Sequence, residues 1–217
     1  MVLRISAAIS ALAALVSCGP LNEGNVSRGF LAVVQSKIAG DAPAGPVAPP
    51  ITRAQADANP GAFMLVTAYG GASVASLVVA STNGNRQTWI SADSVTVTTE
   101  NGIIVATRGF PRDLIAAEVS GVVQALVNSG GTATRVHETI NDLDQISTEL
   151  LQCSIVLDGR EVITVLEKTS QTSRFKETCT GETVAFTNTY WITDQGRMIR
   201  SSQAVAPETG FLLVERP

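Results

Sequence analysis

The chain contains few residues suited to nucleophilic or metal-dependent catalysis. It has a single histidine, His137, among 217 residues. Triad hydrolases need a histidine as general base, and one histidine is too few for the usual zinc ligand sets unless cysteines complete them. The sequence also has no G-x-S-x-G, P-loop, H-E-x-x-H or paired C-x-x-C pattern. His137 is either a general base near neutral pH or a residue on the surface of a strand, and we favour the second interpretation.

Basic residues are also scarce. There are 15 Lys and Arg against 19 Asp and Glu, a formal net charge of -4. Removal of a leader over residues 1–17 would take Arg4 away and leave 14 - 19 = -5. Binding to nucleic acid needs a basic face that replaces counterions, so we expect no nucleic-acid partner.

Long apolar runs are absent, which excludes a permanent transmembrane helix of about 20 residues. The stretch 5–16 follows Arg4 and is typical of a secretory signal peptide, here 1–17. Small residues lead directly into Cys18, an arrangement that resembles a bacterial lipobox. Such a cysteine carries a diacylglyceryl group and an acylated amino terminus, for example with palmitate. The alternative is an ordinary signal peptide in which Cys18 has no role.

The residue after this cysteine is Gly19, whereas aspartate there would resemble an inner-membrane retention signal. Similarity to sorted bacterial lipoproteins therefore favours the periplasmic side of the outer membrane. Two or more acyl chains anchor a protein stably, so the membrane is an expected partner through these chains.

Two cysteines, Cys153 and Cys179, remain if Cys18 is lipidated. Export places them in an oxidising compartment, where an even pair is normally bridged. A disulfide across a loop of this length would stabilise the fold by roughly 3 kcal/mol in the chain-entropy description. A redox pair is the alternative, but such pairs usually have C-x-x-C spacing. We therefore expect a structural disulfide.

The mature chain divides into two parts. Residues 18–50 are predicted to be a lipidated N-terminus with a short helix within 20–40 and a proline-rich linker, DAPAGPVAPP, at 41–50. Residues 51–217 have a suitable size for a single domain, which we expect to be β-rich and periplasmic.

This domain is predicted to be mainly β, with about nine strands and one or two accessory helices. The helices are expected at 52–58, capped by Thr52, and at 111–128. Strand signals separated by Gly, Asn and Asp turns lie at 62–69, 73–81, 88–98, 103–108, 134–140, 150–158, 161–168, 174–179, 183–193, 197–205 and 210–215. These signals favour a curved antiparallel sheet, a sandwich or a partial barrel over a parallel α/β fold.

A predicted hairpin near the C-terminus gathers aromatic and arginine side chains. Its turn at 194–196 brings Tyr190 and Trp191 close to Arg197 and Arg200. Adjacent strand residues point to opposite faces, so one aromatic should lie in the core and the other should be partly exposed. An exposed aromatic beside arginines can stack on a sugar ring, but cross-strand packing is the alternative that we favour for any single residue.

No pair of carboxylates stands out for glycoside hydrolysis. The candidates lie mostly in turns or at the ends of predicted elements: Asp93, Glu100, Asp113, Glu118, Asp142 and Asp144. We expect no catalytic residue, no metal and no cofactor.

Three segments carry a family pattern. They are 86–93 (RQTWISAD), 102–114 (GIIVATRGFPRDL) and the hairpin from Tyr190-Trp191 through Gly196-Arg197 to Pro207-x-x-Gly210. With the lipobox, they resemble the YjbF/GfcB-type group 4 capsule polysaccharide lipoproteins over nearly the whole mature chain. The matching residues, whose individual roles the resemblance leaves undefined, are Trp89, Arg108, Gly109, Asp113, Tyr190, Trp191, Gly196 and Arg197.

The resemblance implies a non-enzymatic accessory lipoprotein that assists secretion or assembly of capsule or exopolysaccharide. Polysaccharide and export-machinery proteins are then the expected partners. They would meet a glycan or partner face formed by Trp89, Arg108, Tyr190, Trp191, Arg197 and Arg200. Two alternatives stay open, a carrier of lipid or lipoprotein acyl chains and a glycan-modifying enzyme with a carboxylate pair.

Overall fold

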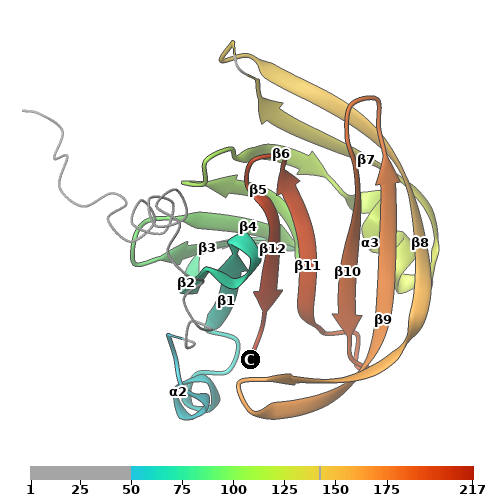
Figure 1. The fold of residues 1–217 in the computed structure, drawn as a ribbon. Helices are drawn as coiled ribbons and strands as arrows, with labels where there is room; N and C mark the ends of the chain where they lie inside the picture. The colour runs from blue at the N-terminus through green and yellow to red at the C-terminus, as the bar shows by residue number, and fades with distance from the viewer. Residues whose placement is uncertain (1–49, 142) are drawn as a thin grey trace, which may run out of the picture.

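A computed structural model describes residues 50–141 and 143–217 (Figure 1). Its helical segments are α2 (Arg53–Ala58), the 3₁₀ turn η1 (Tyr69–Gly71) and α3 (Ser120–Val127). Its strands are β1 (Phe63–Ala68), β2 (Ser73–Asn83), β3 (Arg86–Ser91), β4 (Thr96–Glu100), β5 (Ile103–Arg108), β6 (Leu114–Glu118), β7 (Gly131–Ile140), β8 (Ile146–Val165), β9 (Lys168–Thr180), β10 (Ala185–Ile192), β11 (Met198–Ala206) and β12 (Gly210–Glu215). Cys18, the helix expected within 20–40 and most of the linker lie outside the described residues.

The strands follow one another around a nearly closed ring (Figure 1). Neighbours run in the order β5-β4-β3-β2-β1-β12-β11-β10-β9-β8-β7-β6, and every pair is antiparallel. Chain order and spatial order therefore agree around the ring, which lacks a ladder only between β5 and β6. The mainly β, antiparallel prediction is confirmed, but the sheet has 12 strands rather than about nine and is barrel-like rather than a sandwich.

Two predicted elements are divided differently in the structure. The strand expected at 88–98 is split into β3 and β4, because Ser91 starts a tight turn in which its amide donates to the Val95 carbonyl at 2.9 Å. The helix expected at 111–128 begins with β6 and becomes helical only in α3. Pairing of β6 with β7 overrides the local helical period in that segment.

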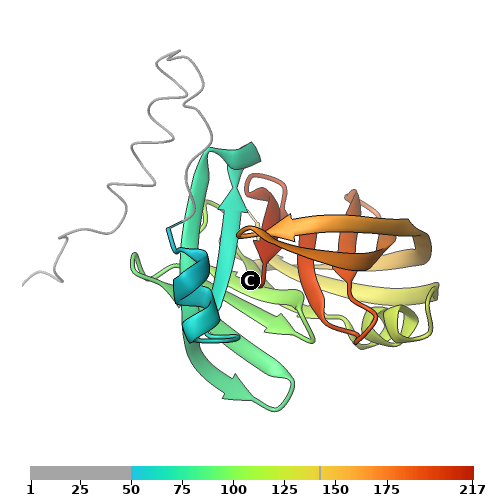
Figure 2. The ribbon, with the colours of Figure 1, turned by 90° about the horizontal axis from the view of Figure 1, so that it is seen from below.

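The hairpin of β8 and β9 extends beyond the ring. A register shift just before Gly159 bends β8 where the sequence predicts a turn, so the strands expected at 150–158 and 161–168 belong to one strand that continues through the bend. We call residues 160–174 beyond this bend the arm. The arm passes over the outer side of β10 and β11 (Figure 2), where Ile163 packs with Ile199. Leu166 at its tip reaches the small core beneath α2.

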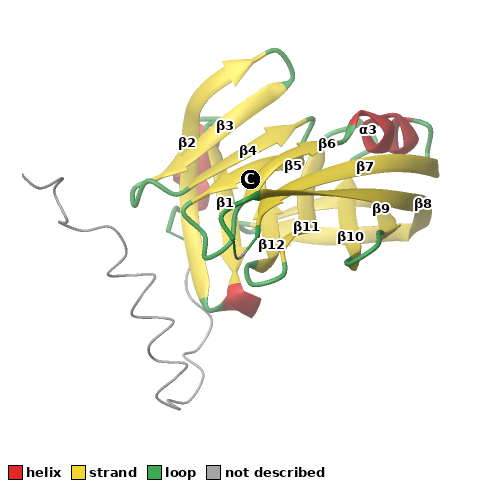
Figure 3. Cartoon of the chain, turned by 90° about the horizontal axis from the view of Figure 1, so that it is seen from above, coloured by secondary structure: helices red, strands yellow, loops and turns green. Residues whose placement is uncertain are grey.

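The main core fills the inside of the ring, because alternate residues of each strand point inward. Its large apolar side chains include Met64, Leu77, Trp89, Val97, Ile103, Leu114, Leu151, Ile155, Phe175, Tyr190 and Leu212. Helix α3 lies against β7 and β8 (Figure 3), and its Val122 and Leu126 join this core. Helix α2 is capped by Thr52, as predicted.

Side chains rather than a ladder close the gap between β5 and β6, which we call the seam. The Asp113 carboxylate accepts hydrogen bonds from the amides of residues 109–110 at 3.0 and 3.2 Å and from Thr107 Oγ1 at 2.8 Å. Arg108 reaches across the seam and donates to the Leu114 carbonyl at 3.1 Å. The family residues Arg108 and Asp113 therefore hold the ring together at its opening.

Replacing Asp113 with alanine should lower the free energy of unfolding by about 2 kcal/mol, because three hydrogen bonds to a carboxylate are lost. Urea unfolding measures this change. The matched control is Asp93→Ala at an exposed turn, which should change stability by less than about 0.5 kcal/mol. Equal effects of the two substitutions would contradict the role given to the seam.

Candidate functional site

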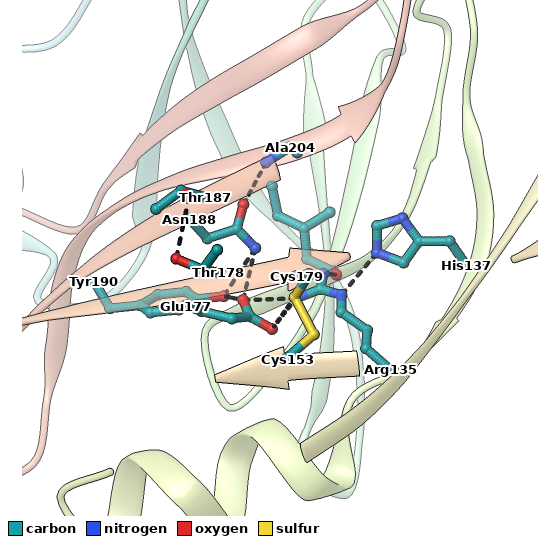
Figure 4. The surroundings of a disulfide bond; sticks show 11 residues. Arg135, His137, Cys153, Glu177, Thr178, Cys179, Thr187, Asn188, Tyr190 and Ala204 are labelled. Carbon is teal, nitrogen blue, oxygen red and sulfur yellow. Dashed lines mark hydrogen bonds and ion pairs between the residues drawn. A yellow bond between two sulfur atoms is a disulfide. The ribbon is translucent and has the colours of Figure 1, made fainter. Parts of the chain in front are cut away.

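Polar side chains from β7, β9 and β10 meet inside the ring (Figure 4). We call the following five residues the interior polar cluster: Arg135, His137, Glu177, Asn188 and Tyr190. Arg135 Nη1 lies 3.1 Å from Glu177 Oε2, and both side chains are fully buried. The same carboxylate accepts hydrogen bonds from Asn188 Nδ2 at 2.7 Å and from the Tyr190 hydroxyl. Burial, and then the charge of Glu177, raise the pKa of Tyr190, so this hydroxyl keeps its proton.

Arg135 of the cluster and the buried side chain of Gln203 also support β5 from within the ring. Arg135 Nη2 donates to the Ile104 carbonyl at 3.4 Å. Gln203 on β11 accepts from the Ile104 amide at 2.8 Å and donates to the Gly102 carbonyl at 3.1 Å. Because β5 is an end strand of the sheet, interior side chains satisfy backbone groups that have no neighbouring strand on that side.

His137 is buried, at 5 % exposure, which corrects the expectation of a surface position. Its Nε2 accepts a hydrogen bond from Arg135 Nε at 2.7 Å, so the imidazole proton must sit on Nδ1. Burial, and then the charge of Arg135, lower the pKa of His137 to about 3. The imidazole is therefore neutral at pH 7 and too weakly basic there for general-base catalysis.

A cleft of about 510 Å³ opens at one end of the ring, and we call it the mouth cleft. His137 lines it beside Phe186, whose ring stacks on the imidazole with 5.4 Å between centroids. Glu149 in the cleft accepts hydrogen bonds from the amide and hydroxyl of Thr183 at 2.7 and 2.9 Å. The amide bond is the larger cause of a lowered pKa for Glu149, so this carboxyl stays ionised and is unsuited to act as a general acid.

The structure contains the expected disulfide between Cys153 and Cys179, at directly opposite positions of β8 and β9 with 4.1 Å between Cα atoms. Cys179 Sγ lies 3.3 Å from Glu177 Oε1, beside the interior polar cluster. These three residues are close enough together to resemble a metal-ligand set. Because the sulfur atoms are bonded to each other and Glu177 pairs with Arg135, the group offers no thiolate ligand.

The six residues expected on one glycan or partner face do not form a single surface, although Trp89 and Arg197 line the same cleft. Trp89 is only 1 % exposed, its Nε1 donates to Thr99 Oγ1 at 3.3 Å, and the Arg216 guanidinium lies 5.0 Å from its ring. Tyr190 is buried in the interior polar cluster. Both side chains point into the ring, which corrects the expectation that they contribute to an exposed face.

The other four residues are outside the main core and do not form one patch, although Trp191 and Arg200 are cross-strand neighbours. Trp191 is partly exposed, opposite in direction to its neighbour as predicted, and the Arg200 guanidinium lies 5.8 Å from its ring. Arg200 is also 2.6 Å from Glu215, so this arrangement matches the cross-strand packing alternative. Arg108 bonds across the seam, and Arg197 is exposed at the turn between β10 and β11.

Sequence reasoning does not find the interior polar cluster, although a signal for it exists. Arg135 and His137 are two residues apart on one strand, and Glu177 precedes Cys179 by two. Residues at this spacing share one face of a strand. A cysteine expected to form a buried disulfide marks the inward face, so Glu177, which is in phase with it, is a candidate buried carboxylate.

The family described as "Group 4 capsule polysaccharide lipoprotein gfcB, YjbF" matches residues 36–216, which is most of the chain. The chain belongs to this family. A similar solved structure is that titled "hypothetical lipoprotein YmcC" from Escherichia coli (K12), with a TM-score of 0.68 and 17% sequence identity. The match covers 88% of this chain and 96% of that chain, and it reflects a shared fold. No curated protein matches this chain.

Residues 36–216 of this YjbF-family chain include all three segments that carry the family pattern. In the structure, Trp89 and Tyr190 are core residues and Asp113 holds the seam, so these positions are structural. Cys18 lies outside both the matched and the described residues. Within 50–141 and 143–217, no helix has the length and apolar character needed to cross a membrane.

The chain has one histidine, so the main change in its free energy of unfolding between pH 7 and pH 5 can be assigned to His137. The pKa of His137 is about 3 in the folded state and about 6.5 when unfolded, so the unfolded state binds more protons between these values. The free energy of unfolding should therefore fall by about 2 kcal/mol between pH 7 and pH 5. His137→Gln should remove most of this slope in urea unfolding. An imidazole NMR signal that titrates near pH 6.5 in the folded protein would contradict the assignment.

Proposed function

We propose that this protein is a non-enzymatic accessory factor in the secretion or assembly of capsule or exopolysaccharide, held on the periplasmic side of the outer membrane by acyl chains on Cys18. The observation that carries the proposal is the family match over residues 36–216. The lipobox-like sequence that ends at Cys18 supports the anchored part of it.

The position of Cys18 limits how far the domain stands from the membrane. It lies 32 positions before Pro50, the first described residue (50 - 18 = 32). A fully extended chain of this length spans at most about 110 Å. A domain on such a tether can reach polysaccharide or export proteins close to the inner leaflet of the outer membrane.

The side-chain chemistry favours binding or assembly over catalysis. His137 is neutral and weakly basic, and Glu177 is occupied by Arg135 and two further donors. In the mouth cleft, Glu149 is bonded to Thr183, and hydrolysis of a glycoside needs an acid whose pKa is raised rather than lowered.

A lipid carrier is a weaker account of this fold. An acyl chain needs an apolar cavity, whereas the middle of this ring holds the buried Arg135–Glu177 ion pair. Core side chains pack around this pair, and the mouth cleft lies at one end of the ring.

Cys18→Ala, exported behind an ordinary cleavable signal peptide, should give a soluble periplasmic protein. We expect surface polysaccharide to fall several-fold in the strain, while the urea midpoint of the purified domain stays unchanged. Cell fractionation and a polysaccharide assay measure the two outcomes. The matched control is Ser17→Ala, which keeps a small residue before the cysteine and should remain membrane-bound. Full polysaccharide export by the soluble variant would contradict the proposal.

A further inference from the structure

A cleft of about 200 Å³ lies on the outside of the ring, between α2, the arm, the turn from β10 to β11 and the end of β12. We call it the basic cleft, because four cationic side chains line it: Arg53, Lys168, Arg197 and Arg216. Among the described residues, no Asp or Glu lines it. On a chain with a net charge of -4, the fold has gathered positive charge from four distant segments into one place.

The acidic groups around the basic cleft neutralise only Arg53 among its four cations. Three carboxylates near the cleft already form ion pairs. Asp57 lies 2.6 Å from Arg53, which lines the cleft. Asp194 lies 3.9 Å from Arg160, and Glu215 lies 2.6 Å from Arg200. Lys168, Arg197 and Arg216 form no ion pair within the described part of the chain. Arg216 Nη2 donates to Gln87 Oε1 at 3.3 Å and to Thr99 Oγ1 at 3.2 Å, so Lys168 and Arg197 are the cations most available to a ligand.

Arg53 also has donors without acceptors. Its Nη2 donates to Asp57, whereas its Nε and Nη1 are buried with no hydrogen-bond partner. Buried donors in native proteins are nearly always satisfied, so a pair without acceptors calls for an explanation. Arg197 and Arg216 line the cleft together, and burial, and then the charge of Arg197, lower the pKa of Arg216. A bound anion would offset this repulsion.

A larger cleft of about 560 Å³ adjoins the basic cleft and shares Arg197 and Arg216 with it. Its lining residues include Gln87, Asn101 and Phe63, and Gln87 Oε1 already accepts a hydrogen bond from Arg216 at 3.3 Å. Amides can bond sugar hydroxyls, and an aromatic ring can contact the apolar face of a sugar. We call it the amide cleft.

We propose that the basic cleft and the amide cleft together bind an acidic saccharide. The sugar ring lies in the amide cleft, and its carboxylate or phosphate group lies on the four cations. Arginine binds both kinds of anion through paired N–H donors. The inference rests on the proposed function, because it names acidic polysaccharide as the ligand class of the accessory factor.

Calorimetric titration of the full mature lipoprotein in non-ionic detergent tests the inference with three probes. Trigalacturonic acid supplies carboxylates, glucose 1-phosphate supplies a phosphate, and maltotriose is neutral. At least one anionic probe should bind about tenfold more tightly than maltotriose. This preference should weaken as NaCl is added, because salt screens exposed charges.

Two substitutions locate the binding. Lys168→Gln and Arg197→Gln replace exposed side chains and should each weaken binding of the anionic probe by about tenfold without changing the urea midpoint. The matched control is Lys176→Gln, an exposed lysine that lies on β9 outside both clefts and should leave binding unchanged.

The inference is overturned if neither anionic probe binds more tightly than maltotriose, or if Lys176→Gln weakens binding as much as Lys168→Gln. Such a failure is distinct from failure of the proposed function, which is measured in cells through Cys18→Ala. A protein that needs its anchor for export but binds no acidic saccharide would keep the accessory role and lose this ligand class.

Discussion

The buried ion pair between Arg135 and Glu177 constrains the whole inside of the ring. Both charges are fully buried, and a buried charge without its partner costs about 3–5 kcal/mol. β7 and β9 must therefore keep the positions that join the two side chains. Glu177 in turn holds Asn188 and Tyr190 of β10, and Arg135 fixes the tautomer of His137. The sole histidine is thereby a packed, neutral residue.

The same principle applies at the one place where the ring lacks a ladder. Polar side chains satisfy the end strand β5 from inside through Arg135 and Gln203. At the seam, Asp113 and Arg108 make the corresponding bonds. A ring closed in this way uses its interior polar groups for structure. The basic cleft, where we propose that a ligand binds, lies outside the ring where the arm and α2 meet it.

The sequence was sufficient for the class of fold and for features set by local chemistry. The capped helix at Thr52 and the antiparallel strands follow from residues within a few positions of each other. The disulfide follows from the expected export to an oxidising compartment. The helix expected at 111–128 was wrong at its start because β7 pairs with that segment, a contact that local periodicity does not contain. Two of the missing strands arise because the turn after Ser91 has no glycine to mark it and because β6 lies in a segment with a helical period.

The site was less predictable for a related physical reason. Trp89 and Tyr190 are aromatic residues whose exposure depends on which face of the strand is inward, and both point inward. The four cations of the basic cleft lie between residues 53 and 216, so only the closed ring brings them together. Of the expected face, Arg197 alone contributes to that cleft.

A double-mutant cycle on Arg135 and Glu177 tests the central claim most directly. Arg135→Gln and Glu177→Gln should each lower the free energy of unfolding by about 3 kcal/mol, because each leaves a buried charge unpaired. The double variant leaves no such charge, so its loss should fall short of the sum by at least about 2 kcal/mol. Additive losses in urea unfolding would contradict the claim that this ion pair organises the inside of the ring.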